Sequence, residues 1–180
     1  RRRVWRWRRF GSVVVMNMKR ILRHILATSR LVSRAFPRHT LIAIEKAIRT
    51  GETTHGGEIR FVVEGALDGA PLLRGQSARE RAIEVFSQLR VWDTEHNNGV
   101  LIYLLLADRD VEIVADRGIH AKTSAQDWEK ICRTMEAAFK RGNYEMGVVG
   151  GIQAVTLHLQ RHFPAAGDHR NELPDKPIVL

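Results

Sequence analysis

Several common sequence features are scarce in this chain of 180 residues. It has a single cysteine, Cys132, so an internal disulfide cannot form and a disulfide-stapled secreted framework is excluded. No stretch approaches the roughly 20 consecutive apolar residues that a membrane-spanning helix requires. No apolar segment followed by a small-residue cleavage site stands near the start. We therefore expect a cytoplasmic protein, at most peripheral at the membrane, without a signal peptide or transmembrane helix.

Acidic residues are absent from the first 44 positions. This segment carries 12 of the 29 Lys and Arg residues, whereas residues 45–180 hold 17 basic against 20 acidic residues. The net charge of +9 thus belongs to a basic arm joined to a mildly acidic domain. The high pI therefore does not indicate a specific nucleic-acid binder. Binding of nucleic acid through the arm alone stays open as one alternative.

The arm itself divides into two parts. Residues 1–15 are rich in Arg, Trp and Val and begin without Met, whereas Met16 and Met18 are plausible starts. This stretch is either a leader outside the domain or an Arg/Trp peptide that contacts membranes or nucleic acid. From Met18 the pattern predicts a basic amphipathic helix, which would rest on an anionic membrane surface, dock on the domain or form a solvated tail. Its apolar stripe would comprise Ile21, Leu22, Ile25 and Leu26.

The centre of the predicted sheet lies within residues 97–118. The apolar run from Val100 to Ala107 is unbroken and β-rich, which is typical of a strand buried on both faces. A short polar connection, 108–110, leads directly into the run 111–115, so we expect an antiparallel hairpin. Upstream, a strand at 58–64 and a capped helix at 77–91 precede the strand at 99–107. That order predicts a right-handed βαβ unit with two parallel strands.

Helix signals complete the predicted fold. Ser77 with Glu80 and Ser124 with Asp127 form capping boxes, and Thr40 is predicted to cap a further helix. We expect an α/β three-layer sandwich with a Rossmann-like mixed sheet and helices on both faces. Its parts would be a basic, partly disordered arm at 1–39, the domain at 40–163 and an extended tail at 164–180. The predicted buried stripes are Leu41, Ile44 and Ile48; Ala82, Val85, Phe86 and Leu89; Trp128, Ile131, Cys132, Met135 and Phe139; and Val148, Ile152, Val155 and Leu159.

Strands paired in this way would gather polar residues at one edge of the sheet, where the first two strands begin and the third ends. We call this edge the strand-start rim. Carboxylate and amide oxygens are the ligands that Ca²⁺ and Mg²⁺ prefer, and an Arg side chain can hold a phosphate through a bidentate fork. The alternative is that these residues only form turns, caps and local ion pairs. The expected rim residues are His55, Glu58, Asp93, Glu95, His96, Asn97, Asn98, Asp116, Arg117 and Gly118, with Asp93, Glu95, Asn98 and Asp116 as the metal ligands.

Other candidate sites carry weaker signals. The opposite rim would hold Glu64 and the residues 108–110, and ligands of open α/β sheets usually bind beyond the carboxyl ends of parallel strands. We favour the strand-start rim because it gathers more polar groups. His158 and His162 have the spacing of a zinc-binding pair but lack an identifiable third ligand. Cys132 lies on an apolar stripe, which indicates a core residue and not a nucleophile.

Four segments resemble the TPM domain family. They begin at Glu58, Asn98, Val111 and Tyr144, and the resemblance covers about residues 40–163. Within it, the family's Asn-Gly and Gly-Arg-Gly elements fall on Asn98-Gly99 and on 116–118, where Asp116 replaces the first Gly. The sequence is most similar to short bacterial members, which end in a tail like Asn-Glu-Leu-Pro at 171–174.

The resemblance implies an α/β sandwich, binding of a divalent cation and, for some members, acid phosphatase activity on phosphomonoesters. Asp116, Arg117 and Asp93 would then be the catalytic residues, with Ca²⁺ or Mg²⁺ as cofactor. The alternative is a non-enzymatic Ca²⁺-binding module that assembles with membrane-associated proteins, such as the LemA-type proteins that often accompany relatives. Residues 18–39 would suit such a role at an anionic membrane surface.

Overall fold

The computed structural model describes residues 18–27, 29–165 and 171–180. The predictions for residues 1–15 lie outside these ranges. In chain order the described elements are α1 (Met18–Leu26), α2 (Ser29–Ala35), α3 (Arg38–Glu52), β1 (Glu58–Glu64), α4 (Gly69–Leu73), α5 (Ala78–Gln88), β2 (Gly99–Leu105), β3 (Asp110–Ala115), α6 (Arg117–His120), α7 (Ala125–Lys140), α8 (Tyr144–His162) and β4 (Ile178–Val179).

The strands form one mixed sheet in the order β3-β2-β1-β4. β1 and β2 are parallel, with Glu58 opposite Gly99, and β2 pairs antiparallel with β3, with Val100 opposite Ala115. The predicted βαβ unit and hairpin are therefore confirmed. The tail adds a short fourth strand, because Ile178 and Val179 pair parallel with Val62 and Val63. The sequence predicts only an extended tail for this part of the chain, so the strand is a finding of the structure.

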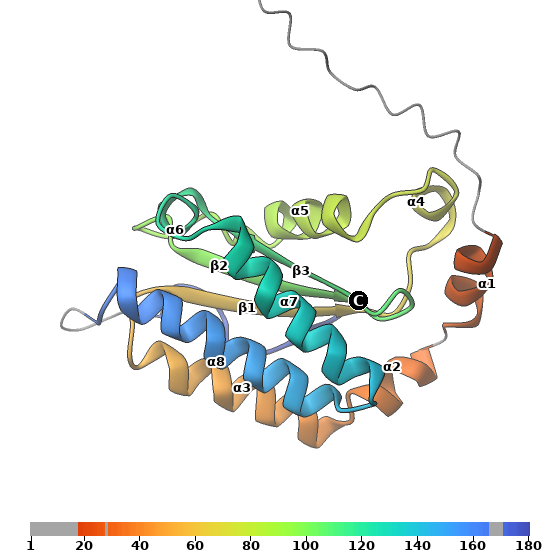
Figure 1. Cartoon of the computed structure of the whole chain (residues 1–180), viewed down its shortest axis with the longest axis horizontal. Coiled ribbons are helices and arrows are strands. Elements are labelled where there is room, and N and C mark those ends of the chain that lie inside the picture. The colour runs from red at the N-terminus through yellow and green to blue at the C-terminus, as the bar shows by residue number, and fades with distance from the viewer. Residues whose placement is uncertain (1–17, 28, 166–170) are drawn as a thin grey trace, which may run out of the picture.

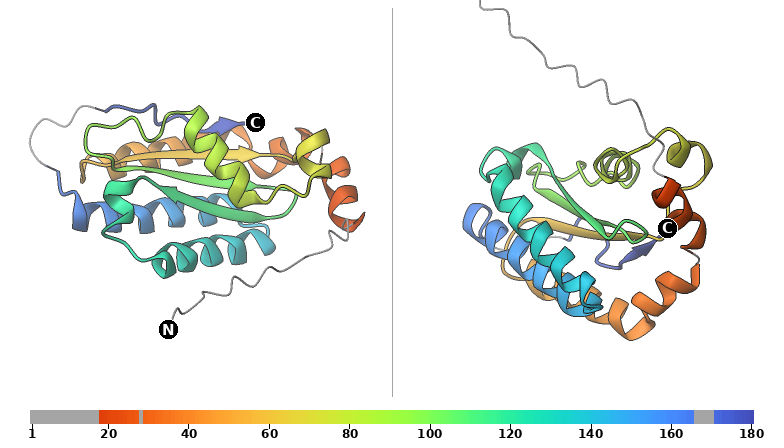
Figure 2. Two further views of the ribbon diagram at one scale, coloured as in Figure 1. Left: turned by 90° about the horizontal axis from the view of Figure 1, so that it is seen from above. Right: turned by 45° about the vertical axis from the view of Figure 1, so that its right-hand side comes forward.

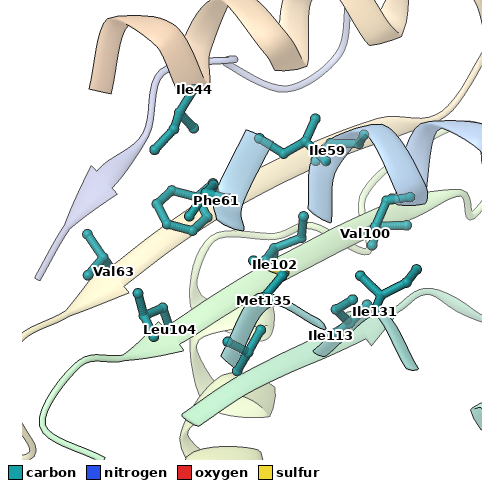
Figure 3. Close-up of a cluster of buried hydrophobic side chains, with 14 of the residues drawn as sticks. Ile44, Ile59, Phe61, Val63, Val100, Ile102, Leu104, Ile113, Ile131 and Met135 are labelled. Carbon is teal, nitrogen blue, oxygen red and sulfur yellow. The ribbon is translucent and has the colours of Figure 1, made fainter. Parts of the chain in front are cut away.

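Helices cover both faces of the sheet, which confirms the predicted three-layer α/β sandwich. In Figures 1 and 2, α3, α7 and α8 lie on one face and α5 lies on the other. Side chains alternate between the two faces along β1, since Ile59, Phe61 and Val63 join the larger hydrophobic cluster and Val62 joins the smaller one. Figure 3 shows the larger cluster, where side chains of β1, β2 and β3 meet Ile44, Ile131 and Met135 of the helices.

Local sequence signals explain where two of the helices begin. Ser77 and Glu80 form a complete capping box at α5, and Ser124 and Asp127 form another at α7. The predicted cap at Thr40 is wrong. α3 already begins at Arg38 after Pro37, and the Thr40 hydroxyl instead donates to Oε2 of Glu145, 2.7 Å away on α8. Pro37 suits that position because the first amide groups of a helix have no partner within it.

The segment before α3 packs partly against the sheet. Val32 and Phe36 are buried in the larger cluster, and the Phe36 ring lies 5.9 Å from that of Phe61. α1 sits near the ends of β1 and β2, at the right of Figure 1, whereas α6 sits at the other end of the sheet. Among the helices in the described part of the chain, none combines the length and apolar character needed to cross a membrane.

Candidate site at the strand-start rim

The strand-start rim forms as the hairpin geometry predicts. Residues 55–57 lead into β1, residues 93–98 lead into β2, and residues 116–118 leave β3. The backbone joins these segments directly, because Asp116 N–H donates to the Gly99 carbonyl (2.9 Å) and Gly118 N–H donates to the Asn97 carbonyl (2.9 Å). Residues about 20 positions apart in the sequence therefore share one edge of the sheet.

Asp116 stands at the point where β3 passes into α6. Its side chain is only 7% exposed, and its Oδ1 accepts the Arg117 N–H at 2.7 Å. Its Oδ2 is buried and has no hydrogen-bond partner among the described residues. A buried carboxylate oxygen without a donor is costly. Asp116 is thus oriented by its own helix, with one acceptor oxygen left over.

Asn98 occupies the corresponding position before β2. It is fully buried, its N–H donates to Oγ1 of Thr94 (3.1 Å) and its side-chain amide donates to the Gly56 carbonyl (2.6 Å). These bonds hold the amide group in place and tie the start of β2 to the segment before β1. The Oδ1 atom of Asn98 is buried without a partner among the described residues. Asn98 precedes Gly99 in the chain, and Asp116 donates its N–H to the Gly99 carbonyl. The start of β2 and the end of β3 therefore each contribute one buried oxygen without a partner among the described residues.

Arg117 contacts the neighbouring loop through an amide group. Its Nε donates to Oδ1 of Asn97 at 3.0 Å, and the residue is exposed. No ion pair of Arg117 occurs within the described ranges, so the alternative of a local ion pair is not found there for this residue. Gly118 lets the chain after β3 approach the loop before β2 closely. A Cβ at this position would lie 2.5 Å from the Asn97 carbonyl oxygen and 2.7 Å from that of His96.

The two remaining predicted ligands lie on the outside of the rim. Asp93 and Glu95 are exposed, as is His96. Within the described ranges, no group of three or more His, Cys, Asp or Glu side chains is arranged to hold a metal ion. Ca²⁺ and Mg²⁺ also bind amide and backbone oxygens. The four-residue ligand set and the catalytic roles of Asp93, Asp116 and Arg117 remain predictions.

The C-terminal tail crosses this rim, which sequence reasoning missed. Glu58 is fully buried, and its two carboxylate oxygens accept the N–H groups of Glu172 and Leu173, each at 3.1 Å. The Glu172 carboxylate in turn accepts the N–H of Glu95 at 3.0 Å. Glu58 therefore fastens the tail and is not presented to solvent. His55, also predicted for this rim, is buried and accepts the Gly57 N–H through Nδ1 (3.2 Å).

A further acidic residue, Glu52, lies beside the start of β1 at the end of α3. Its Oε1 accepts the Ile59 N–H at 2.9 Å. Burial, with the nearby negative charges of Glu58 and Asp175, raises the pKa of Glu52 to about 9. Glu52 is therefore protonated at neutral pH. No local signal marks this residue, because its burial depends on the strand and the tail, which are distant in sequence.

At the opposite rim, two acidic side chains hold helices against the sheet through hydrogen bonds to Arg residues. Glu64 accepts Nε and Nη2 of Arg81 on α5, at 2.9 and 3.1 Å. Asp108 accepts Arg20 Nε at 2.8 Å and Arg23 Nη2 at 2.9 Å, both from α1. Burial alone would raise the pKa of Asp108, but its hydrogen bonds with Arg20 and His24 hold that pKa below the ordinary value of an aspartate. Of the other two predicted residues, Arg109 forms the turn with a positive φ of 54° and Asp110 begins β3.

The surroundings of the weaker candidates, His158, His162 and Cys132, indicate neither a metal site nor a nucleophile. The His158 ring packs 5.3 Å from the Trp128 ring, and no metal-holding group that includes His158 or His162 is found in the described part of the chain. Cys132 is partly buried against the larger cluster. Burial, followed by the charges of Glu112 and Glu136, raises the pKa of Cys132 to about 12. A thiol that stays protonated is a poor nucleophile.

Comparisons with known proteins point to one family. The TPM domain family model matches residues 33–157. The solution structure of the BA42 protein from the psychrophilic bacterium Bizionia argentinensis is 32% identical, with a TM-score of 0.70 over 79% of this chain and 93% of that one. The N-terminal domain of a P. gingivalis protein shares the fold at 21% identity, with a TM-score of 0.53 over 67% of this chain and 76% of that one. No curated protein matches the chain.

Proposed function

Because the chain belongs to the TPM domain family, we propose that it is a divalent-cation-dependent member whose cation site is the strand-start rim. One observation carries this proposal: Asn98 Oδ1 and Asp116 Oδ2 are both buried and have no hydrogen-bond partner within the described residues. A carboxylate and an amide oxygen are the donor types that Ca²⁺ and Mg²⁺ prefer. A cation that accepted both lone pairs would offset the cost of burying them.

The residues around this pair fit such a cation. Asp93 and Glu95 lie in the same loop as Asn98, and their exposed carboxylates can turn toward a cation without breaking a buried contact. Asp116 is kept in position through its other oxygen, which the Arg117 N–H already uses. The proposed ligands are therefore Asp93, Glu95, Asn98 and Asp116, with either Ca²⁺ or Mg²⁺ as the ion.

The proposed activity is hydrolysis of phosphomonoesters. A bound divalent cation supplies Lewis acidity, which polarises a phosphoryl oxygen and favours attack by water. Arg117 is exposed beside Asp116 and uses one guanidinium nitrogen on Asn97, so its terminal nitrogens can hold a phosphate. Asp116 and Asp93 would supply ligands or the base that accepts a proton from the attacking water.

A thermal-shift titration with CaCl₂ and MgCl₂ tests the cation site. Wild type should show a saturable rise in melting temperature, because a ligand that binds only the folded state stabilises it by about 2.7 kcal/mol at 100 times its Kd. Asp116→Asn keeps the side-chain shape and the Oδ1 acceptor but removes the charge, so most of the rise should disappear. Asp68→Asn changes an exposed carboxylate before α4 and serves as the matched control. No rise in wild type would refute the site.

Turnover of p-nitrophenyl phosphate then separates the enzyme from the alternative module. Cation-dependent turnover that is lost in Asp116→Asn and weakened in Arg117→Lys would support the phosphatase, since Lys keeps the charge but not the bidentate fork. Cation-dependent stabilisation without turnover would support a non-enzymatic Ca²⁺-binding module that assembles with membrane-associated proteins such as those of the LemA type. The exposure of Asp93, Glu95 and Arg117 favours this second candidate, because it leaves them open to a protein partner.

A further inference from the structure

Helix α1 exposes a row of large apolar side chains. Met18, Leu22, Ile25 and Leu26 are 69%, 56%, 69% and 67% exposed. Their spacing of four, three and one residues places them along one side of the helix. We call these four side chains the outward stripe. An apolar group of this size on a nine-residue helix is unusual for a surface that faces only water.

The side of α1 that faces the protein is mostly polar. His24 is 3% exposed, its Nδ1 accepts the Leu67 N–H at 2.9 Å, and its Nε2 lies 3.1 Å from Oδ2 of Asp108. Arg20 reaches the same carboxylate and also donates to the Gln76 carbonyl at 2.8 Å. Of the predicted apolar stripe, Ile21 packs against the smaller hydrophobic cluster, whereas Leu22, Ile25 and Leu26 face outward.

This orientation is the reverse of the usual one. A surface helix of a globular domain buries its apolar side and exposes its polar side. In α1 the hydrogen bonds of His24 and Arg20 fix the helix with a polar side inward, so the outward stripe is held away from the core. The fold therefore maintains an exposed apolar surface that does not contribute to the hydrophobic core.

Exposed basic residues lie on the same helix as the outward stripe and on the helix that follows it. Lys19 and Arg23 are exposed on α1 itself, and Arg30 is exposed in the first turn of the next helix, α2. Arg23 pairs with Asp108 and yet leaves 55% of its side chain exposed. Exposed apolar side chains beside exposed bases complement a layer that is apolar inside and negatively charged at its surface. α1 also lies at one end of the molecule, at the right of Figure 1, where a flat surface can reach it.

We propose that the outward stripe of α1 and the neighbouring bases bind the surface of an anionic lipid bilayer. The four apolar side chains enter the boundary between headgroups and acyl chains. Lys19 on α1 and Arg30 at the start of α2 contact the anionic headgroups. His24, Arg20 and Asp108 keep the helix attached to the domain while its other side lies in the membrane. This role is independent of the cation site.

Vesicle co-sedimentation of the full chain tests the proposal. Phosphatidylcholine vesicles with phosphatidylglycerol should bind about tenfold more protein than pure phosphatidylcholine vesicles. The double variant Leu22→Ser/Ile25→Ser should lose about tenfold of that binding, because it removes apolar contact without touching the inward residues. The matched control is Met146→Ser/Leu157→Ser on α8, whose side chains are 66% and 65% exposed, and it should bind like wild type.

A second variant separates charge from apolar contact and covers the case in which the first fails to fold. Lys19→Glu/Arg30→Glu retains the outward stripe but should lose the preference for phosphatidylglycerol. Circular dichroism checks that each variant remains folded. Binding that is unchanged in both variants would assign the contact to another segment and overturn the proposal, as would the absence of binding in wild type. Self-association that the Leu22→Ser/Ile25→Ser variant abolishes, without vesicle binding, would overturn it too and identify an interface between copies of the chain.

Discussion

The hydroxyl group of Tyr103 on β2 donates a 2.6 Å hydrogen bond to Oε2 of Glu64 on β1. The same carboxylate accepts two nitrogens of Arg81 from α5, so a buried charge is satisfied from two elements. Burial and Glu64 raise the pKa of Tyr103, which therefore remains a donor at neutral pH. This network joins the βαβ crossover helix to both of its strands.

Removal of the Tyr103 hydroxyl should weaken the fold. We expect Tyr103→Phe to lower the free energy of unfolding by about 1.5–3 kcal/mol, the usual contribution of a hydrogen bond to a charged group. Urea unfolding measures this change. Tyr144→Phe is the control, because no hydrogen bond of its hydroxyl is found within the described ranges, and it should change stability by less than about 0.5 kcal/mol. Equal losses in both variants would contradict the importance of the Glu64 network.

Glu58 should control the attachment of the tail. Glu58→Gln replaces an acceptor oxygen with a donor nitrogen, so one of the N–H groups of Glu172 and Leu173 loses its partner. We expect a loss of about 2–3 kcal/mol and faster hydrogen exchange at those two amides, measured by NMR. Glu129→Gln, which affects only an exposed pair with Arg133, should change stability by less than about 0.5 kcal/mol. Unchanged protection of both amides would show that other contacts hold the tail.

The raised pKa of Glu52 predicts a pH dependence of stability. Its pKa is about 9 in the folded chain against 4.5 as the ordinary value, so the folded state holds a proton that the unfolded state releases between these values. The contribution is fully present below pH 4.5 and is lost as the pH rises through about 9. The stability advantage of wild type over Glu52→Gln should therefore shrink from pH 5 to pH 9, as measured by urea unfolding. A constant difference across this range would refute the assignment.

Two glycines should respond oppositely to alanine. Gly118→Ala places a Cβ 2.5 Å from a backbone oxygen, which the rim can accommodate only by moving, and we expect a loss of about 1–3 kcal/mol. Gly150 lies in α8, and no atom beyond the adjacent backbone of its own helix lies within 4 Å of the added Cβ, so Gly150→Ala should stabilise the chain by about 0.5–1 kcal/mol. Thermal unfolding distinguishes the two. A neutral Gly118→Ala would show that the close approach to Asn97 is unnecessary.

Local signals predicted most of the architecture. The sequence predicts the capping boxes at Ser77 and Ser124 because both partners of each lie within four residues, and a β-branched run predicts β1 at 58–64. The strand-start rim followed from one further step, since a hairpin returns the chain to the edge where its first strand began. The TPM domain assignment, made on an ordered set of short segments, is confirmed by the family match.

Long-range contacts account for what sequence reasoning missed. Thr40 resembles a cap, but its partner is Glu145 on another helix. Glu58 resembles a rim ligand, but two amides of the tail occupy its carboxylate. Glu52 and Thr94 are ordinary polar residues in sequence, and they acquire roles only through Ile59 and Asn98. Each case depends on a partner whose position the fold alone determines.

The attachment of α1 and the strand-start rim lie at opposite ends of the sheet, because His24 and Arg20 bind Leu67 and Asp108, beyond the ends of β1 and β2. A seven-residue strand spans about 23 Å, whereas fixed charges in water are screened within about 8 Å at physiological ionic strength. A bilayer that held α1 would therefore leave the rim outside its layer of concentrated counterions. Ions and phosphate esters would reach the rim at their bulk aqueous concentrations, independently of the lipid composition below.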